Sequence, residues 1–307
     1  MSLDHGFLGG PDRATRRRSL VLLSLLLASA ALLLSACGKS EAQKAREAEQ
    51  AAKDAAYREK YAKAKALFEE RCKTAGVVVK RVVKDVEGIE LTKIRQPIPF
   101  GGREYFDPMF PGAAMADEAQ GDAYIASFLY SELRNPNTPE ARGVIQPPHA
   151  EPGLNQSAPR RGYRYVDVAD SASGHRWRYH VVPKLTDAEF RERGGWAKDL
   201  ERTSTSATRP RFALDFEDIV DPDDRAYWVA GTRIKVIDQQ TGEVIAQLTR
   251  FVWDPSFGVS STGRLPWQHA GSRLDQKCPY FPGTMGYATR FFSDTVLQPK
   301  QPGRAGE

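Results

Sequence analysis

The first 37 residues limit which part of this chain can enter a folded domain. A basic cluster, Arg13 and Arg16–Arg18, precedes an apolar run from Leu20 to Leu34, and small residues follow. This order is typical of a secretory signal peptide, which is removed from the mature protein. The run of 15 residues makes a helix about 22 Å long, which is short against a hydrocarbon core of about 30 Å. We therefore exclude residues 1–36 from the predicted fold.

The end of this leader carries a candidate modification site. Leu34-Ser35-Ala36-Cys37 resembles the lipobox of bacterial lipoproteins, in which the cysteine sulfur receives a lipid and the peptide is cut just before it. We expect Cys37 to be the acylated first residue of the mature chain. Gly38 follows it in place of aspartate, which favours the outer membrane, facing the periplasm. Thr15-Arg16-Arg17 is also similar to a twin-arginine signal, although the strongly apolar run favours the general secretory route.

The composition is that of an ordinary globular protein. Hydrophobic residues make up 41% of the chain and charged residues 27%, which excludes wholesale disorder and a multi-span membrane protein. Its 307 residues allow one large domain or two small ones. The formal charge of +5 falls to +3 when residues 1–36 are removed, and this mild excess does not indicate a nucleic-acid partner.

The mature chain is predicted to begin with a long helix. Residues 39–73 are rich in Ala, Lys and Glu, a composition typical of a solvated helix. An apolar stripe at helical spacing exists only in the second half; its members are Tyr57, Tyr61, Ala64, Phe68 and Cys72. We expect residues 37–55 to form the lipid anchor and a helical stalk, and residues 56–307 to form a single envelope domain.

That domain is predicted to be β-rich and of the α+β class, built from antiparallel hairpins. Residues 97–160 hold 10 of the 20 prolines, so few strand ladders can run through them. The predicted strands are 77–83, 89–94, 211–219, 227–238 and 244–253, with 77–83 and 89–94 forming one hairpin and the last two joined by a turn at 239–242. The predicted helices are 119–133 and 186–200, and a Ser/Thr linker covers 203–208.

Residues 162–182 form the clearest predicted hairpin, with strands Gly162–Ala169 and His175–Val182. Period-two alternation puts the aromatic side chains on one face, namely Tyr163, Tyr165, Trp177 and Tyr179. The same alternation puts Arg164, Arg176 and Arg178 on the other face. These arginines are the candidate binding residues, and the alternative interpretation is an ordinary solvated face.

Two cysteines remain after Cys37. In an oxidising envelope such a pair usually forms a disulfide, so we predict a Cys72–Cys278 bond that joins the N-terminal helix to the C-terminal segment. The alternative is two separate buried thiols.

No assembled catalytic, cofactor or metal motif is recognisable. His175 and His180 lie five residues apart in a predicted strand, on opposite faces, and cannot share one metal ion without a bulge. Asp215 and Glu217 share a strand face, so a pair of catalytic carboxylates is geometrically conceivable. The alternative for this acidic stretch, which includes Asp221-Pro-Asp-Asp224, is a solvated strand and an Asp-Pro turn.

Several segments of the mature chain look like parts of a known family. They are Glu70–Gly76, Val86–Arg95, Asp215–Ile219, Asp223–Gly231, Val236–Glu243, Pro266-Trp267 and Cys278-Pro279. Together they resemble a family of proteobacterial lipoproteins to which no activity is assigned. The resemblance implies an envelope location and a shared core, and it supplies no catalytic residues.

The sequence therefore favours a lipid-anchored, non-enzymatic binding protein of the cell envelope. A narrower version is an immunity-type lipoprotein that neutralises a secreted toxin. The expected partners are membrane lipid, through Cys37, and an acidic protein or an anionic envelope component; no cofactor is expected. The alternative is an envelope hydrolase that acts on cell-wall glycan through Asp215 and Glu217.

Overall fold

The structure is a computed structural model, and it describes residues 39–99, 101–137, 143–147, 160–170, 173–182, 199–259, 265–280 and 286–301. The predicted signal peptide, Cys37 and nearly all of the predicted helix 186–200 lie outside these residues. The chain divides into two compact units, residues 1–59 and 60–307, which we describe separately.

The described part of the first unit is helical. Helix α2 (Glu41–Lys73) begins in it, close to the predicted start. Ser40 caps this helix, because its hydroxyl accepts a hydrogen bond from the Gln43 N–H at 3.2 Å. Glu49 and Lys53 form an ion pair one turn apart, at 2.7 Å. Residues 41–59 are exposed along their whole length, as expected of a solvated helix.

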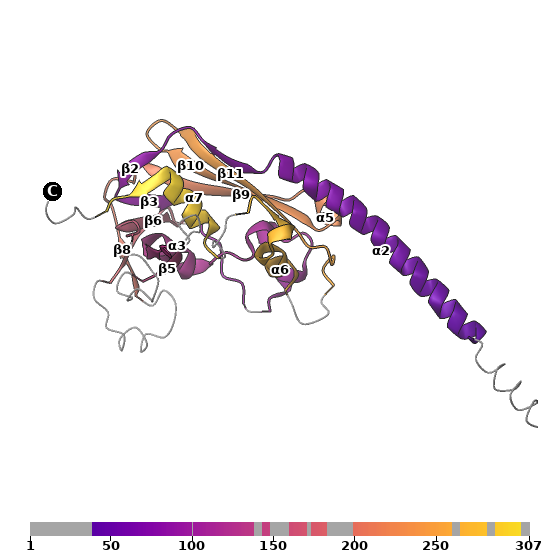
Figure 1. Ribbon diagram of the computed structural model, residues 1–307. Helices are drawn as coiled ribbons and strands as arrows, with labels where there is room; N and C mark the ends of the chain where they lie inside the picture. Colours follow the sequence, from indigo (N-terminus) through magenta and orange to yellow (C-terminus); the bar gives the residue numbers. More distant parts are fainter. Residues whose placement is uncertain are drawn as a thin grey trace, which may run out of the picture. The chain divides into compact units, whose positions relative to one another are not determined.

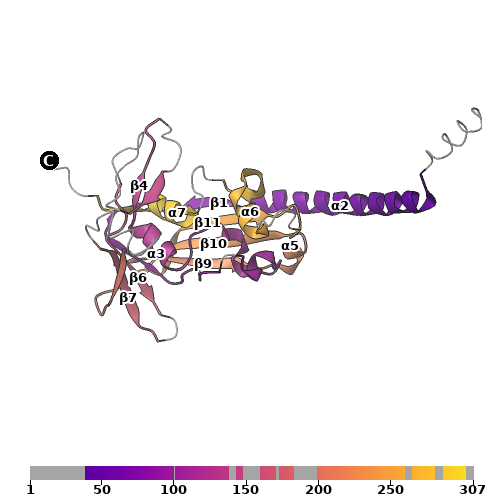
Figure 2. The same ribbon diagram turned by 90° about the horizontal axis from the view of Figure 1, so that it is seen from below.

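The second unit is built on a mixed sheet of nine described strands (Figures 1 and 2). In spatial order they are β1 (Gly76–Val79), β11 (Glu243–Trp253), β10 (Val229–Asp238), β9 (Phe212–Ile219), β3 (Gly88–Leu91), β6 (Tyr165–Ala169), β7 (Arg176–Val181) and β8 (Leu200–Ser204), and β12 (Lys277–Cys278) pairs with β11. Neighbouring strands are antiparallel except β3, which is parallel to both β6 and β9.

Two of the three predicted hairpins are present and one is wrong. The pairs β10–β11 and β6–β7 form as the sequence indicates, and the predicted strand β9 pairs with β10. The segments 77–83 and 89–94 do not pair with each other: β1 joins β11, whereas β3 enters the middle of the sheet. Every residue of β3 is buried, which is the pattern of a parallel strand covered on both faces and not of a hairpin arm.

Two small sheets and short helices surround the large sheet. The small sheets pair β2 (Val83–Val86) with β13 (Leu297–Pro299) and β4 (Ser131–Leu133) with β5 (Val144–Gln146). The helices are α3 (Gly121–Leu129), α5 (Pro222–Ala226), α6 (Pro266–Ser272) and α7 (Ala288–Val296), with 3₁₀ turns at Arg103–Phe106, Pro111–Met115 and Leu274–Gln276. The predicted helix 119–133 is thus too long, because its last three residues form strand β4. The first two residues of the predicted linker 203–208 belong to β8.

The main hydrophobic core lies between one face of the sheet and helices α3 and α7 (Figure 1). Leu91, Leu214 and Ile234 from the sheet meet Phe128 of α3 and Phe292 of α7 there, all nearly or fully buried. We call this side the inner face. A second cluster lies at the α6 end of the sheet, where the stacked rings of Trp228 and Trp267 are 4.9 Å apart.

The C-terminal turns of α2 cover part of the opposite, outer face. Ala64 and Phe68 pack against Val229, Phe251 and Trp253. The Cys72–Cys278 disulfide, predicted from the sequence, closes the same cluster across 206 residues. Ala64 and Phe68 of the predicted apolar stripe are therefore buried against the outer face of the sheet.

This disulfide is expected to contribute strongly to stability. Closing a loop of this length is worth about 5 kcal/mol on the chain-entropy model. The double variant Cys72→Ser/Cys278→Ser should lose up to that amount in the free energy of unfolding, measured by urea denaturation. Dithiothreitol should destabilise the wild type and leave the double variant unchanged; equal sensitivity of both proteins would contradict the prediction.

Candidate functional site

The outer face of the sheet carries two buried carboxylates near its centre. Along β3, Ile89 and Leu91 enter the core while Gly88 and Glu90 face outward; along β6, Val166 and Val168 enter the core while Asp167 faces outward. Glu90 and Asp167 are directly paired in register and completely buried. Like charges directly opposite each other in a sheet repel, so this pair requires cations.

Three arginines and one amide supply the compensation. Arg209 donates from Nε to Glu90 at 2.9 Å and makes a second contact through Nη2. Arg178 donates to both oxygens of Asp167 at 2.7 and 2.9 Å, and Arg176 lies 3.3 Å from the same carboxylate. Gln239 donates to Glu90 at 3.2 Å. We call Arg176, Arg178 and Arg209 the arginine cluster.

Tyr165 extends the arginine cluster toward one end of the sheet. The Arg178 guanidinium lies 3.8 Å from the centre of the Tyr165 ring, within the range of a cation–π contact. On its other side the ring lies against Gly88, where an added Cβ would come within 2.3 Å of ring carbons. Only glycine leaves room for the ring at this position.

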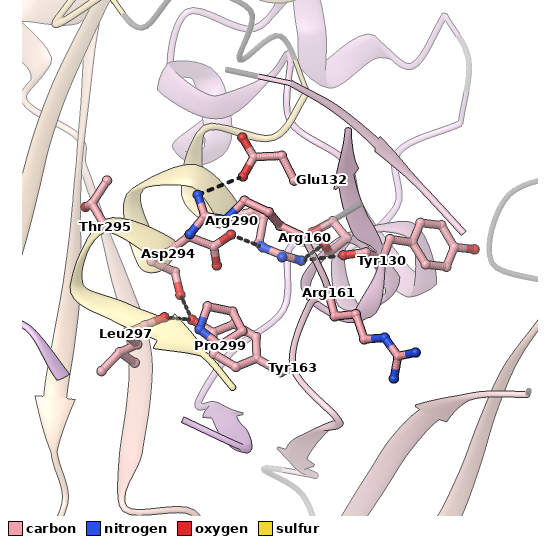
Figure 3. Close-up of polar contacts among 12 residues, drawn as sticks. Tyr130, Glu132, Arg160, Arg161, Tyr163, Arg290, Asp294, Thr295, Leu297 and Pro299 are labelled. Atoms are coloured by element: carbon pink, nitrogen blue, oxygen red, sulfur yellow. Dashed lines mark hydrogen bonds and ion pairs between the residues drawn. The ribbon is translucent and has the colours of Figure 1, made fainter. Parts of the chain in front are cut away.

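The register corrects the predicted faces of the 162–182 hairpin. Val166 pairs with Tyr179 and Asp167 with Arg178, so Tyr165 shares the arginine face and not the aromatic one. Tyr163 precedes β6 and is buried in the main core together with Tyr179, as predicted, and its hydroxyl donates to the Leu297 carbonyl at 2.6 Å (Figure 3). The aromatic-inside prediction holds for β7, whose Tyr179 enters the core.

The three predicted binding arginines do not form one free face. Arg176 and Arg178 are partly buried and contact Asp167, and the hydrogen bond to Asp167 raises the pKa of Arg178. Arg164 lies before β6, is 71% exposed and pairs with Glu87 at 3.6 Å. Alternation could not reveal this difference, because it depends on what lies in the neighbouring strand.

A pocket of about 220 Å³ opens beside Tyr165. Its wall includes the apolar and aromatic residues Val86, Pro210 and Phe212, and the cations Lys84 and Arg211. Lys84 is exposed and makes no ion pair with the described part of the chain. Asp85 and Glu87 also line the pocket. We call this site the basic pocket.

Cations outnumber carboxylates around the basic pocket. Arg81 and Arg211 share the single buried carboxylate of Asp238, at 2.7 and 2.8 Å, and the hydrogen bond from Arg211 lowers the pKa of Asp238 to about 2. Arg164 and Lys300 likewise share Glu87. Each shared carboxylate leaves one positive charge uncompensated. The pocket can therefore bind an anionic group next to an aromatic surface.

The structure gives the acidic strand a different environment from that of a catalytic pair. Glu217 contacts Lys235 at 3.2 Å and Arg233 at 3.3 Å, and these cations lower its pKa. Asp215 accepts a hydrogen bond from Thr92 at 2.5 Å and lies 3.3 Å from Lys93. A glycosidase general acid needs a raised pKa, whereas the net effect of the surroundings of Glu217 is to lower it.

Two other carboxylates of the acidic stretch, Asp221 and Asp224, make hydrogen bonds within the chain. Asp221 caps the short helix α5 by accepting from the Asp223 N–H at 2.9 Å. Asp224 receives a two-pronged hydrogen bond from Arg71 at the end of α2. The interpretation of this stretch as an Asp-Pro turn fits, and its carboxylates are used within the chain.

Two further buried polar networks hold α7 in place. In the first, Arg290 pairs with Asp294 at 2.8 Å and donates to the Ser127 and Tyr130 carbonyls at the end of α3 (Figure 3). In the second, Glu118 accepts from the Ala288 and Thr289 N–H groups at 3.1 and 3.0 Å, at the first turn of α7.

Glu118 is the most perturbed carboxyl group of the second network. Burial raises its pKa to about 7, and the neighbouring Asp117 adds to the effect. Arg250, which pairs with Asp117 at 2.9 Å, lowers the pKa of Glu118 but does not cancel the rise. No local pattern in the proline-rich segment distinguishes Glu118 from other acidic residues there.

Glu118 should give the protein a pH-dependent stability. Its folded-state pKa exceeds the ordinary value of 4.5, so the stabilisation is full at pH 4.5 and is lost as the pH rises through 7. The loss should be about 3 kcal/mol in the free energy of unfolding. Urea denaturation from pH 4.5 to 8 should show this slope in the wild type and a smaller one in Glu118→Gln.

The matched control for this experiment is Glu217→Gln. Glu217 is exposed and its pKa is lowered, so any stability it contributes is present above pH 4.5 and is lost only as the pH falls below that value. Its removal should therefore leave the slope between pH 4.5 and 8 unchanged. A wild-type slope that persists in Glu118→Gln would assign the pH dependence to another group.

Five residues of the arginine cluster and the basic pocket could not be identified from the sequence: Lys84, Glu90, Asp167, Arg209 and Arg211. A signal was present for two of them, because Glu90 and Asp167 each interrupt a run of apolar strand residues. A carboxylate in such a position needs a partner if the strand is buried on both faces. The identity of that partner is not encoded locally.

Comparison with protein-family models, with curated proteins and with solved structures finds no match to this chain. Within the described ranges, no helix is long and apolar enough to span a membrane. The same ranges contain no group of three His, Cys, Asp or Glu side chains placed to hold a metal ion.

Proposed function

We propose that this chain is a lipid-anchored binding protein of the cell envelope, and that the basic pocket binds an acidic segment of a protein partner. The excess of cations around the pocket, next to the Tyr165 ring, is the observation that carries the proposal. Arginine and lysine recognise carboxylates, and an aromatic wall gives the apolar parts of a peptide a contact surface.

The leader supports the location. Its basic cluster, its apolar run and Cys37 together favour export and acylation. Two or three acyl chains hold a protein on a membrane stably, where one chain binds only reversibly. We place the mature protein at the outer membrane, facing the periplasm, because Gly38 follows Cys37.

The narrower proposal is an immunity-type lipoprotein that neutralises a secreted toxin. It rests on the combination of an anchor with a preformed, charged binding surface and on class-level analogy. The hydrolase alternative gains no support, since the carboxylates of Asp215 and Glu217 are paired with cations.

The anchor is tested at Cys37. In the variant Cys37→Ser the sulfur that would receive the lipid is absent, so the protein should move from the membrane fraction to the soluble periplasmic fraction. Labelled palmitate should enter the wild type and not the variant. Absence of label from the wild type would refute the anchor.

The binding surface is tested with exposed cations. The variant Lys84→Glu/Arg164→Glu reverses two charges beside the pocket without exposing a buried carboxylate. Binding of a partner captured from envelope extracts should weaken by roughly tenfold or more, mainly through slower association, and wild-type binding should weaken with salt. Arg176 and Arg178 are unsuitable for this test because they hold the buried Asp167.

The control variant is Arg273→Glu, an exposed charge reversal near α6 at the other end of the sheet (Figure 1). It should leave binding unchanged, and melting curves should show that all variants fold. Equal affinities of the wild type and the pocket variant would contradict the proposal. Binding to anionic phospholipid vesicles alone would assign the pocket to an envelope lipid.

A further inference from the structure

Strand β1 forms one edge of the large sheet and is exposed and apolar. Among the described strands it pairs only with β11, and their order places it last on that side. The sequence from Gly76 to Val79 is Gly-Val-Val-Val, and Val78 is 62% exposed. Val77, Val79 and the nearby Val82 are also exposed. Edge strands of soluble proteins usually carry charges or prolines that prevent pairing, and β1 has neither.

The backbone of β1 has hydrogen-bonding groups directed away from the sheet. The Lys80 N–H donates to the Ile245 carbonyl, so Lys80 belongs to a hydrogen-bonded pair with β11. Because such pairs alternate along an antiparallel ladder, Val78 also bonds to β11, whereas the N–H and C=O groups of Val77 and Val79 point to the open edge.

The surroundings of the edge define the chemistry of a matching strand. Residues 76–84 contain no acidic residue, and Lys80 and Arg81 directly follow the strand. Lys80 lies 3.4 Å from Glu243, and Arg81 shares the carboxylate of Asp238 with Arg211. A hollow of about 240 Å³ lies beside the strand, lined by Val78, Lys80, Val244, Ala246 and Gln247. An incoming strand with apolar residues and acidic flanks would bury the valines and place its carboxylates near the cations.

We propose that β1 binds an extended, acidic segment of a protein partner, which adds to the sheet as a further strand. The backbone groups of Val77 and Val79 supply its main-chain hydrogen bonds, and the exposed valines supply an apolar contact. This surface is distinct from the basic pocket, so it extends the proposed function and is tested by different residues.

A second copy of the chain fits this edge less well. Pairing of β1 with itself would bring Lys80 and Arg81 of each copy close together, and residues 76–84 hold no acidic residue that could lie between these charges. A ladder of four residues is also small against the 1,200 Å² or so that a stable interface buries.

The first experiment alters the ligand and leaves the protein intact. The probe is a synthetic peptide of alternating Val and Thr with two Glu residues at each end, and its Kd is measured by fluorescence anisotropy. Two derivatives carry N-methyl groups on alternate backbone nitrogens, one on each edge of the peptide. A strand can use only one edge to pair with β1, so a derivative blocked on the pairing edge should lose binding.

The two derivatives are the two N-methylation frames of one peptide, and they have the same composition. In one frame the affinity should fall by roughly tenfold, the size expected for losing a few main-chain hydrogen bonds. In the other frame it should be retained. A peptide with Lys in place of Glu should bind more weakly than the acidic one.

The second experiment alters the edge. Val79→Pro removes an N–H that points outward and should weaken peptide binding by roughly tenfold, whereas Val78→Thr keeps shape and backbone and should weaken it less. Melting curves control for folding. Equal binding in both N-methylation frames, equal binding of the Lys peptide, or β1-dependent self-association in sedimentation would overturn the proposal; none of these outcomes bears on the Lys84 and Arg164 test of the pocket.

Discussion

The pairing of Glu90 with Asp167 in the centre of the sheet is the constraint on which the outer face depends. Strand β3 joins the β9–β10–β11 strands to the β6–β7–β8 strands. Glu90 of β3 lies beside Asp167 of β6 on the outer face, and both carboxylates are completely buried. Removing a charge from water is costly unless it is paired. Arg209, from the segment before β9, pairs with Glu90, and Arg178 of β7 pairs with Asp167. These contacts join the two halves of the sheet.

This arrangement gives the molecule two kinds of cation. Partly buried arginines such as Arg178 are bound to carboxylates and stabilise the sheet, so reversing their charge would put a like charge next to the buried Asp167. Exposed cations such as Lys84 and Arg164 contribute little to the fold and remain available to a ligand. The distinction decides which residues can report on binding and which can report only on folding.

The two candidate surfaces differ in their physical basis. The basic pocket selects by charge and by the Tyr165 ring, so its interactions should respond to salt. The β1 edge offers main-chain groups and exposed valines, which respond weakly to salt and depend on the backbone of the partner. Cations flank both surfaces, which is why we propose an acidic ligand for each of them.

The sequence by itself determined the long N-terminal helix, the β9–β10–β11 strands and the cysteine pair, because helical composition, alternation and cysteine number are local or countable properties. It did not determine the place of β3 or the partner of β1, since strands of similar composition pair equally well on local grounds and long-range packing selects among them. The arginine cluster could not be predicted for the same reason. Asp167 and Arg178 become neighbours only through the register of β6 with β7, and one residue of slip would exchange the two faces.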